Sequence, residues 1–283
     1  MTVDVTFWGV RGSFPCASPR HMAFGGNTSC VSVEVDGQVV ILDAGTGMFM
    51  LGKYLAKRGV TEATLLMSHT HTDHIVGFPF FAPAWMGARF DLTVMAGHAT
   101  DCGGIRAVFE MAQHAPLFPV PIAGMGGAAK FVDFIAGDSF ELPPHISIRT
   151  CRLNHPNGAT GYRVEAKGRS ICYVTDTEHY PDRLDPEILA LARGADLLIY
   201  DSTYSDTDYA NKVGWGHSTW QEGLKLARAA DVGQFCAFHH DPDSTDDVME
   251  KVERDLRAAW PEGGLVAREG MTINFTALAM AAE

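Results

Sequence analysis

The chain has 283 residues, of which 46% are hydrophobic and 20% charged; this composition is typical of a globular protein and excludes an extended disordered chain. Its 22 basic and 34 acidic residues give a formal net charge of −12, which disfavours a long nucleic-acid track but leaves room for a small anion bound through metal ions. Six cysteines without a C-x-x-C pair, no signal-peptide pattern and no apolar run of roughly 18 residues indicate reduced thiols, a cytoplasmic location and no membrane partner.

Short runs rich in Val, Ile and Leu predict strands along the whole chain. We expect them at residues 3–8, 31–35, 39–42, 64–67, 92–95, 146–151, 162–164, 171–174, 197–200 and 235–238. Helical patterns occur at about 48–57, 105–113, 186–192, 219–230 and 246–259. Ser218 is expected to cap the helix that begins at 219, with Glu222 near capping-box distance. A stretch rich in proline and glycine, 114–130, predicts a surface loop.

The alternation of strands and helices predicts an α/β layered fold. No linker or internal repeat divides the sequence, so we expect a single domain over residues 1–283.

Several expected strands lead into a titratable residue. These residues are Asp43, His69, His155, Asp176, Asp201 and His239. Ligands of open α/β sheets collect outside the carboxyl ends of the strands, so we expect these side chains to converge. Aspartate and histidine are also common in turns, which explains any one of them alone but not all of them together.

The densest polar cluster is the sequence HTHTDH at residues 69–74. In an extended segment after a strand, His69 and His71 point the same way and can bind one metal ion. Asp73 and His74, beyond the turn, can reach a second. The alternative is a solvated histidine-rich turn, which fits poorly with the buried apolar strand leading into it. The pattern therefore predicts a site for two divalent cations.

On these residues the sequence resembles the metallo-β-lactamase superfamily over nearly its whole length. The five motifs of that family appear in order: Asp43 in LDAGTG, the HTHTDH block, His155, Asp176 and His239. The resemblance implies a four-layer αβ/βα sandwich of two mixed sheets, with helices outside and metal ions at one edge. The cofactors it implies are two divalent metal ions, with zinc expected and manganese as the alternative.

The resemblance also implies a ligand set. His69, His71 and His155 would hold the first ion, Asp73, His74 and His239 the second, and Asp176 would bridge the two. Asp43 would orient the ligand loop. His240 competes with His239, which is preferred because it stands three residues before Pro242.

Two further segments resemble a narrower branch of the superfamily, the ribonuclease Z-type phosphodiesterases. LLIYDSTY at 197–204 and GWGHSTW at 214–220 place Asp201 and His217 where that branch pairs an acidic residue with a histidine. The opening segments GVRGSFP and GGNTSC also resemble this branch and its cyclic-phosphate phosphodiesterase relatives.

These residue types suit phosphodiester hydrolysis. Two divalent ions about 3.5–4 Å apart can activate a water and clamp the phosphate oxygens. A histidine held by a carboxylate is a suitable general acid for the leaving alkoxide, a role we expect for His217 with Asp201. His217 could instead only begin a helix. The resemblance implies that Asp73 orients or deprotonates the attacking water.

Other polar residues give weaker signals. Arg11, Asn27 and Thr28 could donate hydrogen bonds to a substrate phosphate, although the segment 25–29 equally suits an ordinary tight turn, which is favoured. The remaining histidines are expected on the surface or in loops: His21, His98, His114, His145 and His179.

The leading hypothesis is a dinuclear metal-dependent phosphodiesterase acting on a small diester, cyclic or linear. We find neither the glycine- and proline-rich arm that grips transfer RNA in ribonuclease Z nor the cysteine-based zinc site of some cyclic-phosphate relatives. A thioester, lactone or β-lactam hydrolase and a metal-loaded binding or sensory module are the alternatives. The expected partner is a small anionic substrate, without a long nucleic acid, and a homodimer is the assembly to test.

Overall fold

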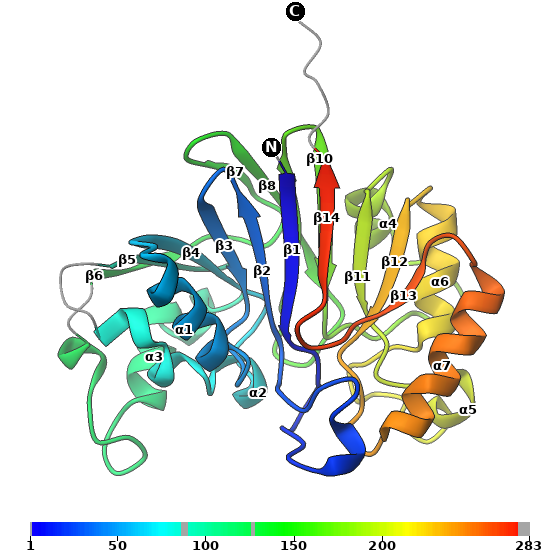
Figure 1. Cartoon of the computed structure of the whole chain (residues 1–283), viewed down its shortest axis with the longest axis horizontal. Helices are drawn as coiled ribbons and strands as arrows, with labels where there is room; N and C mark the ends of the chain where they lie inside the picture. The colour runs from blue at the N-terminus through cyan, green and yellow to red at the C-terminus, as the bar shows by residue number, and fades with distance from the viewer. Residues whose placement is uncertain (1, 86–89, 126–127, 277–283) are drawn as a thin grey trace, which may run out of the picture.

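The computed structural model describes residues 2–85, 90–125 and 128–276. Within these ranges the chain forms two seven-stranded sheets that face each other, with helices on the outer side of each (Figure 1). This is the four-layer αβ/βα sandwich expected from the sequence, and it is confirmed. Among the described helices, none is both long enough and apolar enough to cross a membrane. All six cysteines are free thiols.

The first sheet has the strand order β14-β1-β2-β3-β4-β5-β6. Its strands are β1 (Thr2–Gly9), β2 (Cys30–Val35), β3 (Gln38–Leu42), β4 (Glu62–Met67), β5 (Asp91–Ala96), β6 (Ala128–Asp133) and β14 (Thr272–Thr276). The pairs from β3 to β6 are parallel, with Leu42 opposite Leu66, and the other pairs are antiparallel. The parallel part brings the carboxyl ends of β3 and β4 to the same edge.

The second sheet has the order β13-β12-β11-β10-β9-β8-β7. Its strands are β7 (Ser139–Leu142), β8 (Ile146–Leu153), β9 (Ala159–Ala166), β10 (Arg169–Val174), β11 (Leu197–Asp201), β12 (Gln234–Phe238) and β13 (Gly264–Val266). The pairs from β10 to β13 are parallel and those from β7 to β10 antiparallel. The carboxyl ends of β10, β11 and β12 therefore also meet at one edge.

Helices cover the outer faces of both sheets. On the first sheet lie α1 (Met48–Arg58) and α3 (Ile105–Ala112), and on the second α4 (Pro186–Ala192), α6 (Trp220–Ala229) and α7 (Asp246–Ala259), at the left and right of Figure 1. The short helices are α2 (Thr72–Ile75), α5 (Asp206–Tyr209), η1 (Pro19–His21), η2 (Phe78–Phe80), η3 (Ala82–Trp85), η4 (Thr100–Cys102) and η5 (Ile122–Gly124). The apolar face of each covering helix is buried against its sheet.

The core between the sheets follows from strand alternation. In β1 every second residue is buried, so Val3, Val5 and Phe7 point to the other sheet. The Phe7 ring lies 6.1 Å from that of Phe238, and the Phe238 ring lies 5.6 Å from that of Tyr173. Phe238 ends β12, so this packing fixes where the next residue enters the site.

The structure corrects several element predictions. β6, β7, β13 and β14 are not expected from the sequence, and β6 begins inside the loop predicted at 114–130. Each of them is the outermost strand at one edge of its sheet, and β7 and β13, with four and three residues, are too short to show a pattern. The cap of α6 is Thr219, whose hydroxyl accepts from the Glu222 amide, and not Ser218.

Candidate metal centre

A buried carboxylate organises the segment after β4. Asp43 follows β3 with a φ of 63° and is fully buried. Its Oδ1 accepts from the Ser68 amide at 2.7 Å, while its Oδ2 accepts from the Ser68 hydroxyl at 2.7 Å, His74 Nδ1 at 2.8 Å and the Tyr173 hydroxyl at 2.9 Å. These donors stabilise the buried charge. They also fix His74 with its proton on Nδ1 and its Nε2 facing inward.

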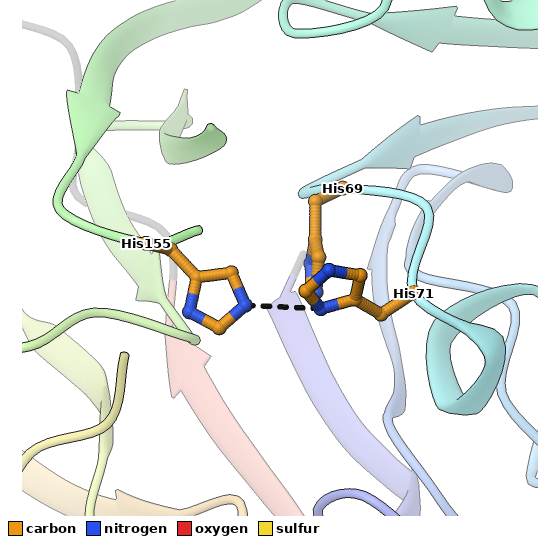
Figure 2. A group of neighbouring side chains, drawn as sticks. All are labelled: His69, His71 and His155. Carbon is orange, nitrogen blue, oxygen red and sulfur yellow. Dashed lines mark hydrogen bonds between the residues drawn. The ribbon is translucent and has the colours of Figure 1, made fainter. Parts of the chain in front are cut away.

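Three histidines form the first cluster. His69 and His71 come from the loop after β4, and His155 from the loop after β8 (Figure 2). His155 Nε2 lies 3.0 Å from His71 Nδ1, and the ligand atoms of the three residues lie within 4.8 Å of one another. Among the described residues, the buried His69 Nε2 has no hydrogen-bond partner.

Asp73, His74, Asp176 and His239 form the second cluster. His74 Nε2 lies 3.2 Å from Asp73 Oδ2, 3.2 Å from Asp176 Oδ1 and 3.3 Å from His239 Nε2. The second oxygen of Asp176, Oδ2, faces the first cluster, 3.6 Å from His69 Nε2 and 3.8 Å from His155 Nε2. Asp176 therefore presents one oxygen to each cluster.

The nitrogen lone pairs show that the clusters fit cations. His155 Nδ1 donates to the Gly216 carbonyl at 2.8 Å, so its Nε2 carries a lone pair that faces His71. His74 Nδ1 donates to Asp43, so its Nε2 lone pair faces His239. Each of these Nε2 atoms can bind a proton or a metal ion. Imidazole and carboxylate donors in this number suit two divalent transition-metal ions.

The charges of the site also favour cations. Burial by itself raises the pKa of Asp176, but the rings of His239, His74 and His69 hold that pKa well below its usual range. Burial by itself lowers the pKa of His74, whereas the carboxylates of Asp176, Asp73 and Asp43 raise it well above its usual value. These carboxylates favour positive charge at His74 Nε2, whether it is a proton or a metal ion.

A histidine–aspartate pair stands beside the clusters. His217 Nδ1 donates to Asp201 Oδ2 at 2.9 Å, and Asp201 also accepts from the Thr177 amide and from the amide and hydroxyl of Thr203. Burial lowers the pKa of His217, but the Asp201 carboxylate raises it, to about 9. In the metal-free protein this raised pKa favours the protonated ring.

An open cavity of about 420 Å³ gives access to the clusters. Its walls include His71, Asp73, Asp176 and His217, together with Ser13, whose amide donates to Asp73 Oδ2 at 2.8 Å. A larger cavity, of about 780 Å³, lies at the β9–β10 hairpin and contains none of the clustered side chains.

Arg11, Asn27 and Thr28, the weaker candidates for binding a substrate phosphate, have hydrogen-bond partners within the protein. Arg11 is fully buried, and its guanidinium donates to the carbonyls of Gly25, Asp241 and Ser244 at 2.6–3.1 Å. The Asn27 amide group donates to Glu269, and the buried Thr28 hydroxyl accepts from the Thr46 amide. These residues hold the loop 25–29 in place, which agrees with the tight turn.

Two sets of histidines remain to be compared with the sequence predictions: the neighbours His239 and His240, and those expected on the surface or in loops. His239, the one preferred from the sequence, lies in the second cluster, whereas His240 Nε2 donates to the Ala267 carbonyl at 2.8 Å. Burial lowers the pKa of His240 to about 3. Of the histidines expected on the surface or in loops, His114 and His145 are exposed, and His98 and His179 lie half-buried in loops. His21 is buried at the end of η1.

Several supporting residues were missed in the sequence. The Thr203 hydroxyl, which donates to Asp201, lies 3.0 Å from His239 Nδ1 and can accept its proton. Ser68 and Tyr173 hold Asp43. Ser68 stands directly before the HTHTDH block and Thr203 two residues after Asp201, so their proximity could have been inferred. Tyr173 lies inside an apolar strand and gives no such signal.

Comparison with known proteins identifies the family. Residues 38–240 match the family described as the Beta-lactamase superfamily domain. The chain is 34% identical to a Ribonuclease Z of Gemmatimonas aurantiaca over 96% of both proteins. Its fold is similar to the metallo-beta-lactamase fold protein YhfI from Bacillus subtilis, with a TM-score of 0.73, 18% identity and coverage of 97% and 100%.

A second solved structure has a similar fold. The fold is similar to that of human tRNase Z, short form, with a TM-score of 0.65, 20% identity and coverage of 96% of this chain and 99% of the human one. The human protein is named a tRNase, and the Gemmatimonas relative is named a ribonuclease.

Proposed function

Because this chain belongs to the metallo-β-lactamase superfamily and is a metal-dependent hydrolase of its ribonuclease Z-like kind, we propose that it hydrolyses a small phosphodiester. The observation that carries the proposal is the pair His217 and Asp201, 2.9 Å apart beside Asp176. A thioester expels a thiolate, which leaves without a proton, whereas a phosphodiester with an alkoxide leaving group needs a proton donor as well as the charge stabilisation that metal ions provide.

We assign the two clusters to two divalent ions, with zinc preferred because the donors are mostly imidazoles. His69, His71 and His155 would hold the first ion, and Asp73, His74 and His239 the second. Asp176 would bridge them, since its two oxygens face different clusters. When bound, such ions lower the pKa of water and stabilise the negative charge on a phosphoryl group. Six free thiols are consistent with the expected cytoplasmic setting.

The residues of the chain supply the remaining chemistry. Asp201 holds the Nδ1 proton of His217, which leaves Nε2–H to donate a proton to the departing oxygen. Asp201 keeps its charge while it does so, because it accepts several other hydrogen bonds. Asp73, fixed by the Ser13 amide at the cavity wall, is placed to orient the attacking water.

An RNA endonuclease is the second candidate, because the Gemmatimonas relative is named Ribonuclease Z. The net charge of −12 favours the small diester, since binding along an RNA strand relies on neutralising many phosphates. Cleavage rates for a precursor transfer RNA and a dinucleotide, measured with the same metal-loaded protein, separate the two candidates.

The substitution His217→Ala tests the proposed function through the leaving group. A p-nitrophenolate leaves without a proton, but a nucleoside alkoxide does not. We expect the kcat for a dinucleoside monophosphate to fall about 100-fold or more, as is typical for loss of a general acid, and the kcat for bis(p-nitrophenyl) phosphate to fall only a few-fold. The matched control is His179→Ala, because His179 lies nearby on Ser218 but outside both clusters. Equal losses on both substrates, at full metal content, would contradict the acid role.

A further inference from the structure

One carboxylate fixes the loop that leads to His217. Glu178 Oε1 accepts from the Tyr209 hydroxyl at 2.6 Å and the Gly214 amide at 2.7 Å, and its Oε2 accepts from the Gly216 amide at 2.9 Å. The backbone of Glu178 is itself fixed, because its amide donates to the Asn154 carbonyl and its carbonyl accepts from the Asn154 side chain. The loop 209–216 therefore has a defined position relative to the end of β8.

The end of this loop touches the metal centre. The Gly216 carbonyl accepts from His155 Nδ1 at 2.8 Å. Gly216 has a φ of +84°, and a Cβ at this position would lie only 2.5 Å from His155 Nδ1, so the close approach requires glycine. His217 follows directly. Trp215 is thus held between a fixed turn and the proton donor.

Trp215 presents its ring to solvent from this fixed backbone. Its side chain is 58% exposed, and Lys212 Nζ lies 4.4 Å from the ring centroid. The same ammonium lies 5.5 Å from the ring of Tyr204, which is 6.1 Å from the ring of His217. A cation–π contact restrains the indole, and the ammonium also offers positive charge in an acidic protein.

We propose that Trp215 is the stacking surface for the base of the leaving nucleoside, with Lys212 beside it. This inference rests on the proposed function, because the leaving group is the part of the substrate that His217 protonates. An exposed aromatic ring on a rigid segment binds flat rings at low entropic cost, and base stacking does not require a particular base. The substrate class is then a phosphodiester of a nucleoside.

The test uses the metal-loaded protein and three substrates. They are thymidylyl-thymidine and its two analogues in which one thymine is replaced by hydrogen; the products identify the leaving nucleoside. We expect Trp215→Ala to lower kcat/KM for the full dinucleotide about tenfold, or about 1.4 kcal/mol, mainly through KM. For the analogue without the leaving base the change should be below twofold. Trp215→Phe should retain most of the activity.

The loop provides a matched control. Val213, 65% exposed and two residues away, lacks an aromatic ring, so Val213→Ala should change no rate more than twofold. The stacking proposal would be overturned if Trp215→Ala lost the same activity on all three substrates, lost none, or lost activity that depends on the base of the nucleoside that does not leave. The proposed function would still stand. If the wild-type protein cleaves neither these diesters nor bis(p-nitrophenyl) phosphate, the proposed function fails and the subsite with it.

Discussion

At the scale of single residues, the centre depends on side chains that set the orientation of others. Asp43 holds the proton of His74 on Nδ1, Gly216 does so for His155, and Thr203 is placed to do so for His239. Each ring thereby turns its Nε2 toward a cluster. Such partners raise the basicity of a metal ligand and reduce the entropy lost on binding.

The substitution Asp43→Asn tests this orientation. The neutral asparagine amide removes the negative charge that Ser68, His74 and Tyr173 stabilise. If its NH2 group faces His74 Nδ1, the proton of that ring moves to Nε2, the nitrogen that faces the second cluster. We expect the zinc affinity to fall about 10- to 100-fold, measured by competition with a chromogenic chelator. Asp196→Asn, at a carboxylate paired with Arg169 away from the site, serves as the control. An unchanged affinity would show that Asp43 does not orient the ligand.

A pH-dependent contribution to stability is expected from His98. Burial lowers its pKa from 6.5 to about 4, and its Nε2 lies 3.2 Å from the Thr70 hydroxyl. The unfolded chain therefore binds more protons at this residue between these values, and the wild-type protein loses stability as the pH falls from 6.5 toward 4. In His98→Asn this loss should be absent. The difference in the free energy of unfolding between the wild-type protein and the variant, measured by urea unfolding, should therefore change between pH 6.5 and pH 4. Parallel curves for the two proteins would contradict the assignment.

The residue-scale predictions succeeded where strand ends carry the signal. Asp43, His69, His155, Asp176, Asp201 and His239 do lie together, because each follows a strand whose carboxyl end lies on the same side of the two-sheet sandwich. Arg11 could not be predicted in this way. Its partners Asp241 and Ser244 are more than 200 residues away, and no local pattern shows that its charge is buried.

At the scale of elements, the long apolar strands and amphipathic helices could be predicted, but the edge strands could not. β10 and β11 are buried almost throughout, so their sequences are continuous apolar runs. β7, β13 and β14 gain their strand conformation from pairing with a neighbour, and their own residues carry little pattern. Element bounds for α4 and α7 agree with the expected ranges.

The loop 209–216 gives an element-scale prediction. Without the Glu178 carboxylate the loop loses the bonds made by Tyr209, Gly214 and Gly216. The Gly216 carbonyl that holds His155, and the backbone that leads to His217, then lose their fixed position. We expect Glu178→Ala to lower the kcat for a dinucleotide about tenfold and also to weaken zinc binding. Glu178→Gln keeps an acceptor oxygen and should restore part of both.

The control for this loop is Glu141→Ala on the exposed side of β7, which should change neither quantity. A lower melting temperature with normal kcat and normal zinc affinity would assign Glu178 a purely structural role.

At the scale of the whole molecule, the metal centre joins the two halves of the sandwich. The segment after β4 of the first sheet carries His69, His71, Asp73 and His74. Strands of the second sheet lead into His155, Asp176 and His239. Bound ions would therefore link the sheets. The sequence could place these ligands at strand ends, but that the two sheets face each other came from the resemblance and from the packing of Phe7 on Phe238.

Removal of metal should therefore lower global stability. A ligand present at about 100 times its Kd stabilises the folded state by about 2.7 kcal/mol, which corresponds to a Tm shift of several degrees in a protein of this size. We expect a chelator to lower the Tm and zinc to restore it. In Asp176→Ala, which lacks the bridging carboxylate, the shift should be smaller, and a chelator-independent Tm in the wild-type protein would contradict a bridging centre.

The most direct test of the account is hydrolysis of bis(p-nitrophenyl) phosphate by the zinc-reconstituted protein, with thioester and lactone substrates assayed in parallel. We expect phosphodiester turnover that is lost with a chelator, returns with zinc and is absent in Asp73→Ala. Hydrolysis of a carbonyl substrate without phosphodiester turnover, at two metal ions per chain, would contradict it and leave Asp201 and His217 as structural residues.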